Sequence, residues 1–296
     1  MEQKVKIIAL AGPSATGKSD LAVKIAEKYC GEIISADSRY VYKEINIASA
    51  KPTEKEKKNI PHHLIDVCDV TEEYSVGKFV KDADKLITDI SNRNKLPVIT
   101  GGTGLYFRSL RGTFDIPQVL PDYDFRKRAE NIPNEELYRE LQTLNPAAAD
   151  KIHFNNKVKI VRAIEIARAN VQPASKDCPY DILWICLNAK NRQYLYDRAD
   201  KRVDKMFEQG LLQEAEFLFG KYGQNSVLMN TIGIKELYGV IYKNADLETA
   251  KEEIKKNTRR YIKRQISWFN TEKDINYIYI DEDDVFAEAE KLISKF

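Results

Sequence analysis

The sequence predicts an α/β fold in which a parallel sheet is flanked by helices. Three observations support this prediction. Short apolar runs alternate with amphipathic stretches in the N-terminal third, glycine-containing turns follow two of the apolar runs, and an apolar run returns after a long helical stretch in mid-chain. Ligands of such sheets bind where the strands end, so the turns after the apolar runs are the first candidates for a site.

The predicted elements follow this rhythm. We expect strands over residues 5–10, 32–35, 64–67, 97–100, 181–187 and 277–280. Apolar residues at helical spacing predict helices over 19–29, 76–90, 192–219, 235–242, 247–269 and near the C-terminus. Residues 121–170 also have a helical pattern, and a loop is expected over 173–179. The interpretation is a core of residues 1–120 and 171–296 with a helical insertion, residues 121–170.

Composition narrows the class of protein. The length of 296 residues and the 43% of apolar residues suffice for a buried core with an insertion. No apolar run approaches the roughly 18 residues of a membrane span, and we expect a cytoplasmic protein without membrane contact. The four cysteines lack C-x-x-C spacing, which argues against a disulfide framework or zinc site. With 47 basic against 45 acidic residues, any nucleic-acid binding depends on local clusters of charge.

The most specific motif comes directly after the first predicted strand. It reads Gly12-Pro13-Ser14-Ala15-Thr16-Gly17-Lys18-Ser19 and fits G-x-x-x-x-G-K-[ST] at every fixed position. Its glycines let backbone N–H groups face an anion, Lys18 supplies a positive charge, and the Ser19 hydroxyl is a ligand for Mg²⁺. The fold is therefore predicted to be P-loop NTPase-like, with phosphates in this loop. The loop by itself leaves open whether they belong to ATP or to another diphosphate.

Two further motifs follow predicted strands. Asp37-Ser38-Arg39-Tyr40 comes after the second strand and Gly101-Gly102-Thr103-Gly104 after the fourth. Taken alone, Asp37 fits a helix cap or turn and Thr103 fits a hydrogen-bonded turn. Because parallel strands end at one edge of the sheet, we expect both motifs to share a cleft with the phosphate loop.

Together with other segments, these motifs resemble the tRNA dimethylallyltransferase (tRNA isopentenyltransferase) family, the prenyl transferases that modify adenosine beside the anticodon. The other segments are residues 49–53, 61–66, 155–166, 202–211 and 263–269. The phosphate loop is common to many families, whereas the ordered set of the others is highly specific. Nearly the whole chain is covered.

The resemblance implies a reaction and roles for named residues. The exocyclic amine of a tRNA adenine attacks dimethylallyl diphosphate and pyrophosphate leaves. Asp37 is the implied general base, Thr103 positions the substrates, and Lys18, the loop N–H groups and Mg²⁺ on Ser19 stabilise the leaving group. The residues implied in binding the tRNA anticodon stem-loop are Asp37, Ser38, Arg39, Tyr40, Thr103, Arg128, Lys159, Arg162 and Lys235. The chain is expected to act as a monomer.

Two residues depart from the family pattern, and the role of a histidine pair is not determined by the resemblance. Asn230 stands where the family usually has arginine, and Val158 stands where the lobe motif usually has an amide. His62 and His63 match the family, and without a carboxylate or cysteine at ligand spacing we favour a structural role over a metal site.

Two alternatives remain at this point. A free adenine-nucleotide prenyl transferase or P-loop kinase would use the same loop, but the helical insertion argues against it. A weakened RNA-binding relative is suggested by Asn230 and Val158 and opposed by the intact Lys18, Ser19 and Asp37.

Overall fold

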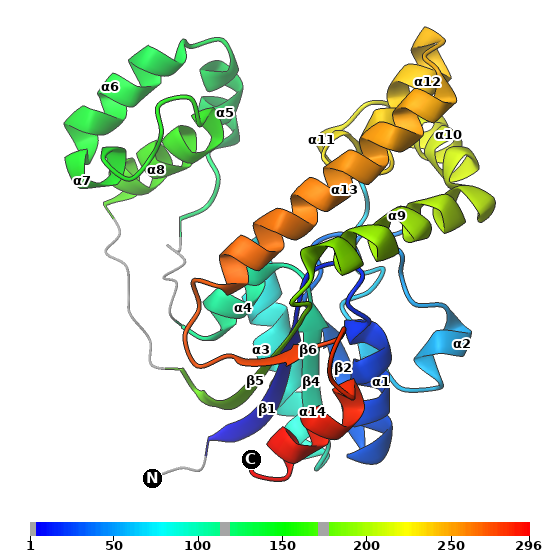
Figure 1. The fold of residues 1–296 in the computed structure, drawn as a ribbon. Coiled ribbons are helices and arrows are strands. Elements are labelled where there is room, and N and C mark those ends of the chain that lie inside the picture. Colours follow the sequence, from blue (N-terminus) through cyan, green and yellow to red (C-terminus); the bar gives the residue numbers. More distant parts are fainter. Residues whose placement is uncertain (1–3, 113–118, 171–177) are drawn as a thin grey trace. The chain divides into compact units, whose positions relative to one another are not determined.

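The computed structural model describes residues 4–112, 119–170 and 178–296 (Figure 1). Contacts divide the chain into two compact units, residues 1–111 with 178–296 and residues 112–177, which we describe separately. The loop predicted over 173–179 lies mostly outside the described residues. None of the described helices is both long and apolar enough to cross a membrane.

A six-stranded parallel sheet forms the centre of the larger unit, with strand order β3-β2-β4-β1-β5-β6. The strands are β1 Val5–Ala11, β2 Gly31–Ser35, β3 His62–His63, β4 Leu96–Gly101, β5 Tyr180–Asn188 and β6 Asn276–Tyr279. At the end of β1, Ala11 lies opposite Gly101 of β4 and Cys186 of β5. The carboxyl ends of these strands therefore share one edge, and the predicted fold class is confirmed.

Helices cover both faces of this sheet (Figure 1). Successive residues of β1 alternate between the faces: Ile7 joins the apolar cluster of α3 (Val76–Asn92), and Ile8 joins that of α1 (Lys18–Lys28) and α14 (Val285–Ile293). A strand that is buried on both faces has to be apolar throughout, which is why β1 could be predicted as a continuous apolar run.

The remaining helices of this unit extend beyond the carboxyl edge or pack beside it. They are α2 Glu54–Lys57, α4 Gly104–Leu110, α9 Arg192–Glu208, α10 Leu211–Tyr222, α11 Ser226–Met229, the 3₁₀ turn η1 Lys235–Leu237, α12 Tyr238–Lys243 and α13 Leu247–Phe269. The longest of them, α13, contacts both α9 and α4.

Three predicted elements were wrong in detail. The strand expected over 64–67 is replaced by β3, because Leu64 and Asp66 have φ values of 60° and 58°, in the left-handed region that ends a strand. The helix expected over 192–219 is interrupted at Gly210, whose φ is 98°, so α9 and α10 are separate. The helix expected over 235–242 begins as the 3₁₀ turn η1.

The smaller unit is the inserted helical lobe. Its helices are α5 Tyr123–Glu130, α6 Asn134–Leu144, α7 Pro146–Ala149 and α8 Lys157–Ala169. Their apolar residues form a core of their own around Phe125, Leu141 and Ile164. The lobe therefore buries its own apolar surface, as a separately packed unit does.

Candidate active site

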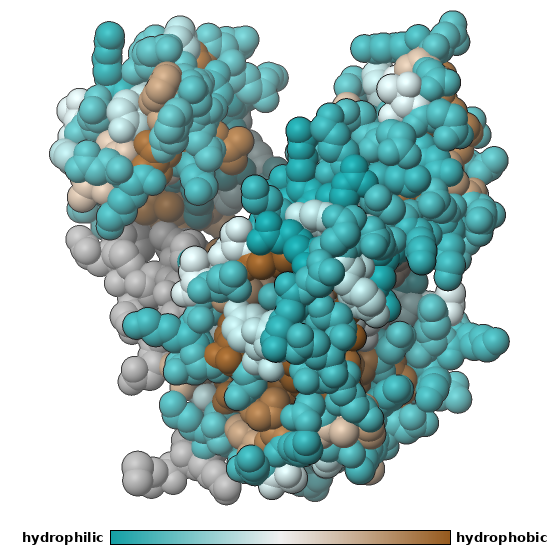
Figure 2. Space-filling model, in the orientation of Figure 1, coloured by the Kyte–Doolittle hydropathy of each residue, from teal (hydrophilic) through white to brown (hydrophobic). Residues whose placement is uncertain are grey.

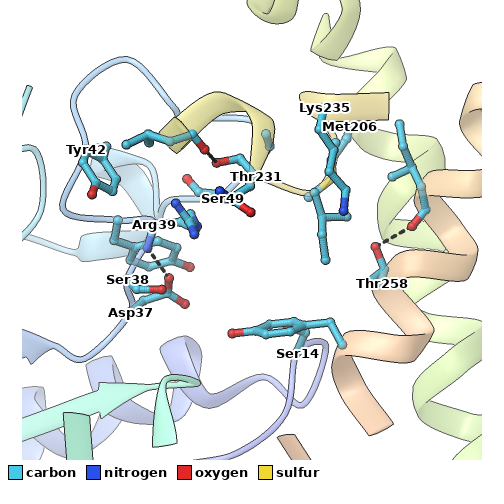
Figure 3. Close-up of a pocket in the computed structure, with 18 of the residues that line it drawn as sticks. Ser14, Asp37, Ser38, Arg39, Tyr42, Ser49, Met206, Thr231, Lys235 and Thr258 are labelled. Carbon is cyan, nitrogen blue, oxygen red and sulfur yellow. Dashed lines mark hydrogen bonds between the residues drawn. The ribbon is translucent and has the colours of Figure 1, made fainter. Parts of the chain in front are cut away.

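A cavity of about 610 Å³ lies at the carboxyl edge of the sheet, within the larger unit. Side chains that enter it come from the phosphate loop, from the loop after β2, from α9, from the segment 226–235 and from α13. Figure 3 shows Asp37 and Arg39 on one side of this cavity and Met206, Lys235 and Thr258 on the other. The motif after β2 and the phosphate loop after β1 therefore meet, as predicted for parallel strands that end at one edge of the sheet.

The phosphate loop is shaped by its backbone. Gly17, with a φ of 85°, occupies the position just before α1, so the helix begins at Lys18 with its N–H groups directed towards the loop. The Lys18 ammonium lies 3.3 Å from the Pro13 carbonyl oxygen. Burial lowers the pKa of Lys18 to about 8, although the nearby charge of Asp37 acts in the opposite direction. A bound anion would stabilise this buried cation.

Asp37 is held at the edge of the cavity by its own loop. Its Oδ1 accepts a hydrogen bond from the Arg39 N–H at 2.9 Å, which leaves the other carboxylate oxygen for a ligand. The Ser38 N–H donates to Thr103 Oγ1 at 3.0 Å. Thr103 thus connects the turn after β4 to the loop of Asp37, although its side chain is not among those that line the cavity.

Two phenols lie near Asp37. Burial and then the charge of Asp37 raise the pKa of Tyr40 to about 12, and the same two causes raise that of Tyr261. Both phenols therefore keep their protons at neutral pH. The Tyr40 hydroxyl donates to the Ala50 carbonyl at 2.7 Å, which fixes this ring.

The cavity is rich in positive charge. Among the described residues, the cations of Arg39, Arg202 and Arg264 have no carboxylate partner in an ion pair, although all three line the cavity. The Arg202 guanidinium donates instead to the Ser49 carbonyl at 3.2 Å, and its charge also acts on Lys18. One turn earlier on α9, Arg198 donates to the Ala15 carbonyl at 2.8 Å. The sequence patterns did not assign Arg198 or Arg202 to the phosphate site. The signal available in the sequence was their i, i+4 spacing, which places both on one face of a helix.

One wall is held in place by Glu214 of α10. Its carboxylate accepts hydrogen bonds from three successive backbone N–H groups, those of residues 46, 47 and 48, at 2.8–2.9 Å. This arrangement fixes the loop that carries Ala48 and Ser49 into the cavity.

The comparison with known proteins identifies the family. A sequence model of the IPP transferase family matches residues 40–272, most of the chain. The chain belongs to the IPP transferase family. It is 38% identical, over 309 aligned residues, to the tRNA dimethylallyltransferase of Caldanaerobacter subterraneus subsp. tengcongensis, and the alignment covers 99% of this chain and 97% of that relative. The resemblance seen in the sequence is thus confirmed, and the chain is a prenyl-transferring enzyme.

Solved structures of the IPP transferase family share the fold. The full-length tRNA isopentenylpyrophosphate transferase from Bacillus halodurans has 36% identity and a TM-score of 0.73, with 99% of this chain and 94% of that chain covered. A eukaryotic dimethylallyltransferase captured acting on tRNA has 29% identity and a TM-score of 0.83, with 98% and 78% covered. Both agree with the P-loop-like core described above.

The remaining basic residues predicted for tRNA binding fall into three environments: the cavity, the exposed surface of the lobe, and an ion pair inside the lobe. Lys235 lines the cavity, and Arg128 and Lys159 are exposed on the lobe. Arg162 donates to the buried Glu165 and to the Val119 carbonyl, both at 2.8 Å, so its charge is paired inside the lobe.

The two departures from the family pattern are both on the surface. Asn230 lines the cavity, but its amide donates to the Ser226 carbonyl at 2.8 Å. Val158 is 80% exposed at the start of α8. Neither side chain supports the core, so substitutions there test binding more than folding.

The histidine pair forms the edge strand β3 and lines none of the cavity. His63 Nε2 lies 2.8 Å from Glu32 Oε2, and His62 Nδ1 lies 2.8 Å from the Ile60 carbonyl oxygen. Hydrogen bonds, first from Arg93, hold the pKa of the Glu32 carboxyl well below its usual range. The part of the chain that the structure describes contains no group of three or more His, Cys, Asp or Glu side chains suited to a metal ion.

Proposed function

We propose that the chain is a tRNA dimethylallyltransferase. It transfers the dimethylallyl group of dimethylallyl diphosphate to the exocyclic amine of the adenosine adjacent to the tRNA anticodon, acting as a monomer. The observation that carries this proposal is one cavity that contains both Lys18 of the phosphate loop and the carboxylate of Asp37. Its family membership and the relatives named for this activity support the same conclusion.

The diphosphate fits the phosphate loop. N–H groups at the start of α1 and the ammonium of Lys18 bind its oxygens, and Arg202 adds a second cation from α9. Mg²⁺ is bound in proteins through one or two oxygen ligands together with substrate phosphates, and the Ser19 hydroxyl beside Lys18 is such a ligand. When bound, the ion supplies positive charge for the departing pyrophosphate.

Asp37 takes the proton of the reaction. The adenine amine forms a bond to the first carbon of the dimethylallyl group, the bond from that carbon to oxygen breaks, and the electron pair leaves with pyrophosphate. The amine proton passes to the Asp37 oxygen that does not accept the Arg39 N–H. The phenols of Tyr40 and Tyr261 stay protonated near this carboxylate, and the Tyr40 proton is donated to the Ala50 carbonyl.

The other walls of the cavity suit the two organic groups. Tyr42, Tyr74 and Tyr261 offer rings on which an unstacked adenine packs, which offsets the few kcal/mol lost when a base leaves its stack. Val203, Met206 and Ile254 offer apolar surface to the dimethylallyl group and exclude water from the reacting carbon.

Positive side chains on the surface suit an RNA backbone. On α13, Arg260, Lys263 and Arg264 are exposed and form no ion pair with a described carboxylate. Figure 2 shows a hydrophilic surface over this helix. We propose that these residues and, on the lobe, Arg128 and Lys159 bind phosphates of the anticodon arm.

The direct test is mass analysis of nucleosides from unmodified tRNA incubated with the pure protein, Mg²⁺ and dimethylallyl diphosphate. The expected result is an adenosine heavier by one dimethylallyl group beside the anticodon, formed without ATP. An absolute need for ATP, or a free adenine nucleotide used as well as tRNA, would contradict the proposal and favour the kinase or free-nucleotide alternatives.

A further inference from the structure

Gln265 of α13 connects two loops of the active site that are far apart in the sequence. Its Oε1 accepts a hydrogen bond from the Ser14 N–H at 2.9 Å, and its Nε2 donates to the Gly102 carbonyl at 2.9 Å. The residue is only 5% exposed. One buried amide therefore joins the phosphate loop to the turn that carries Thr103.

The orientation of this amide is determined by its partners. A flipped amide would direct its NH₂ group at the Ser14 N–H and its oxygen at the Gly102 carbonyl, so both contacts would be repulsive. The turn is also shaped to admit α13. A Cβ atom on Gly102 would lie 2.2 Å from Gln265 Nε2, and one on Gly104 would lie 2.2 Å from the Trp268 ring.

The connection continues from Gly102 to the base. The next residue, Thr103, receives the Ser38 N–H on its Oγ1 at 3.0 Å, and its own N–H donates to the Ala36 carbonyl at 3.2 Å. Asp37 lies between these two contacts in the chain. A continuous set of hydrogen bonds thus runs from the phosphate loop through Gln265 and Thr103 to the residues on either side of Asp37.

We propose that Gln265 is a positioning residue for prenyl transfer, which rests on the function proposed above. It keeps the phosphate loop and the Asp37 loop at a constant separation, so the leaving group and the base act on one bound pair of substrates. A displacement of about 1 Å between reacting groups costs on the order of 10²-fold in rate. Since Gln265 occupies the Ser14 N–H, the diphosphate is bound by the other N–H groups of the loop.

The test uses the full chain with Gln265→Ala and Gln265→Glu. The single-turnover rate with saturating tRNA should fall by on the order of 10–10²-fold in both variants at pH 8. The Kd of dimethylallyl diphosphate, measured without tRNA, should change by less than about threefold, because Lys18 and most of the loop are intact. Gln193→Ala and Gln193→Glu on the exposed face of α9 are matched controls that should keep the wild-type rate.

The pH profile separates positioning from a general loss of stability. The carboxylate that Gln265→Glu introduces repels the Gly102 carbonyl, whereas the protonated carboxyl donates a hydrogen bond to it. The rate of Gln265→Glu relative to wild type should therefore rise as the pH falls towards 5.5, while that of Gln265→Ala stays constant. Gln265→Glu nearly preserves side-chain volume, so it keeps the test valid if the alanine variant fails to fold.

The outcomes distinguish this inference from the proposed function. An active wild type with unimpaired Gln265 variants overturns the inference alone. So does a flat relative pH profile for Gln265→Glu, or a rate loss that follows the folded fraction. A wild type that does not prenylate tRNA overturns both.

Discussion

The arginines of the active-site cavity and those of the helical lobe differ in what neutralises them. In the cavity, Arg39, Arg202 and Arg264 have no described carboxylate partner. In the lobe, Arg126 and Arg162 both pair with Glu165, whose side chain is 1% exposed. Burial alone would raise the pKa of Glu165, but hydrogen bonds from the two arginines bring it below its usual value.

This difference shows that the presence of a basic residue does not establish that its charge is available to bind an anionic ligand. A buried carboxylate is stable only when it is paired and hydrogen-bonded, so Glu165 commits two arginines to the folding of the lobe. The two carboxylates that line the cavity, Asp37 and Glu73, form no ion pair with its three arginines among the described residues, so the arginines are available to an anionic substrate. The two regions should therefore respond differently to substitution: the cavity in catalysis and the lobe in stability.

The largest effect should come from the cavity. Asp37→Asn retains the shape and the hydrogen bond from the Arg39 N–H but removes the base, so single-turnover prenylation should fall by on the order of 10²–10⁴-fold with little change in tRNA affinity. Asp284→Asn, at the exposed N-cap of α14, is the matched control and should keep the wild-type rate. Near-normal turnover by Asp37→Asn would remove this residue from the role of base.

The lobe should respond in stability. Arg162→Ala leaves Glu165 with one arginine, and the free energy of unfolding of the lobe should fall by about 1.5–3 kcal/mol, the worth of hydrogen bonds to a charged group. Arg128→Ala, at an exposed position, should leave unfolding unchanged and flatten the salt dependence of tRNA binding by about 0.7–0.9 per lost phosphate contact. Denaturant unfolding measures the change in stability, and tRNA binding at several salt concentrations measures the change in salt dependence. If Arg162→Ala flattens the salt dependence without loss of stability, the contrast between the regions fails.

The cavity should also respond to pH through Lys18. The pKa of this lysine is lowered to about 8 by burial, so the free protein loses the ammonium charge as the pH rises above 8. Bound diphosphate favours the charged form, and binding then requires uptake of a proton. The Kd of dimethylallyl diphosphate should be nearly constant below pH 8 and rise by up to about tenfold per pH unit above it. Lys18→Arg keeps its charge and should lose this dependence; a wild-type Kd that is flat to pH 9.5 would contradict the assignment.

The smallest effect should come from the departures at the surface. Asn230→Arg places a guanidinium at the edge of the cavity, and it should strengthen the phosphate-dependent step by on the order of 1–2 kcal/mol. Val158→Gln on the lobe should alter the KM for tRNA and leave that for the diphosphate unchanged. KM values for both substrates in both variants provide the measurement. No change in either KM for Asn230→Arg would mean that Lys235 or another cation already supplies the charge.

Much of the fold was determined by local sequence. Apolar runs bounded by glycine turns predicted β1, β2 and β4, because strands covered on both faces have to be apolar throughout. The G-x-x-x-x-G-K-[ST] pattern predicted the loop at the end of β1, because its glycine conformation and the helix that follows depend on neighbouring residues alone. Two of the three errors came where residues adopt a positive φ, as Leu64 and Asp66 do after β3 and Gly210 does between α9 and α10.

By itself, the sequence also determined the family, since ordered motifs are read along the chain without knowledge of contacts. Only the tertiary structure decided which charges are available. Arg198 and Gln265 reach the phosphate loop from helices more than 180 residues away, and Glu165 neutralises an arginine that the sequence suggested for RNA. Helical spacing predicts that such residues lie on one face of a helix, but it does not predict which other segments pack against that face. Ion pairing and burial depend on those distant partners, so the roles of these side chains are set by packing.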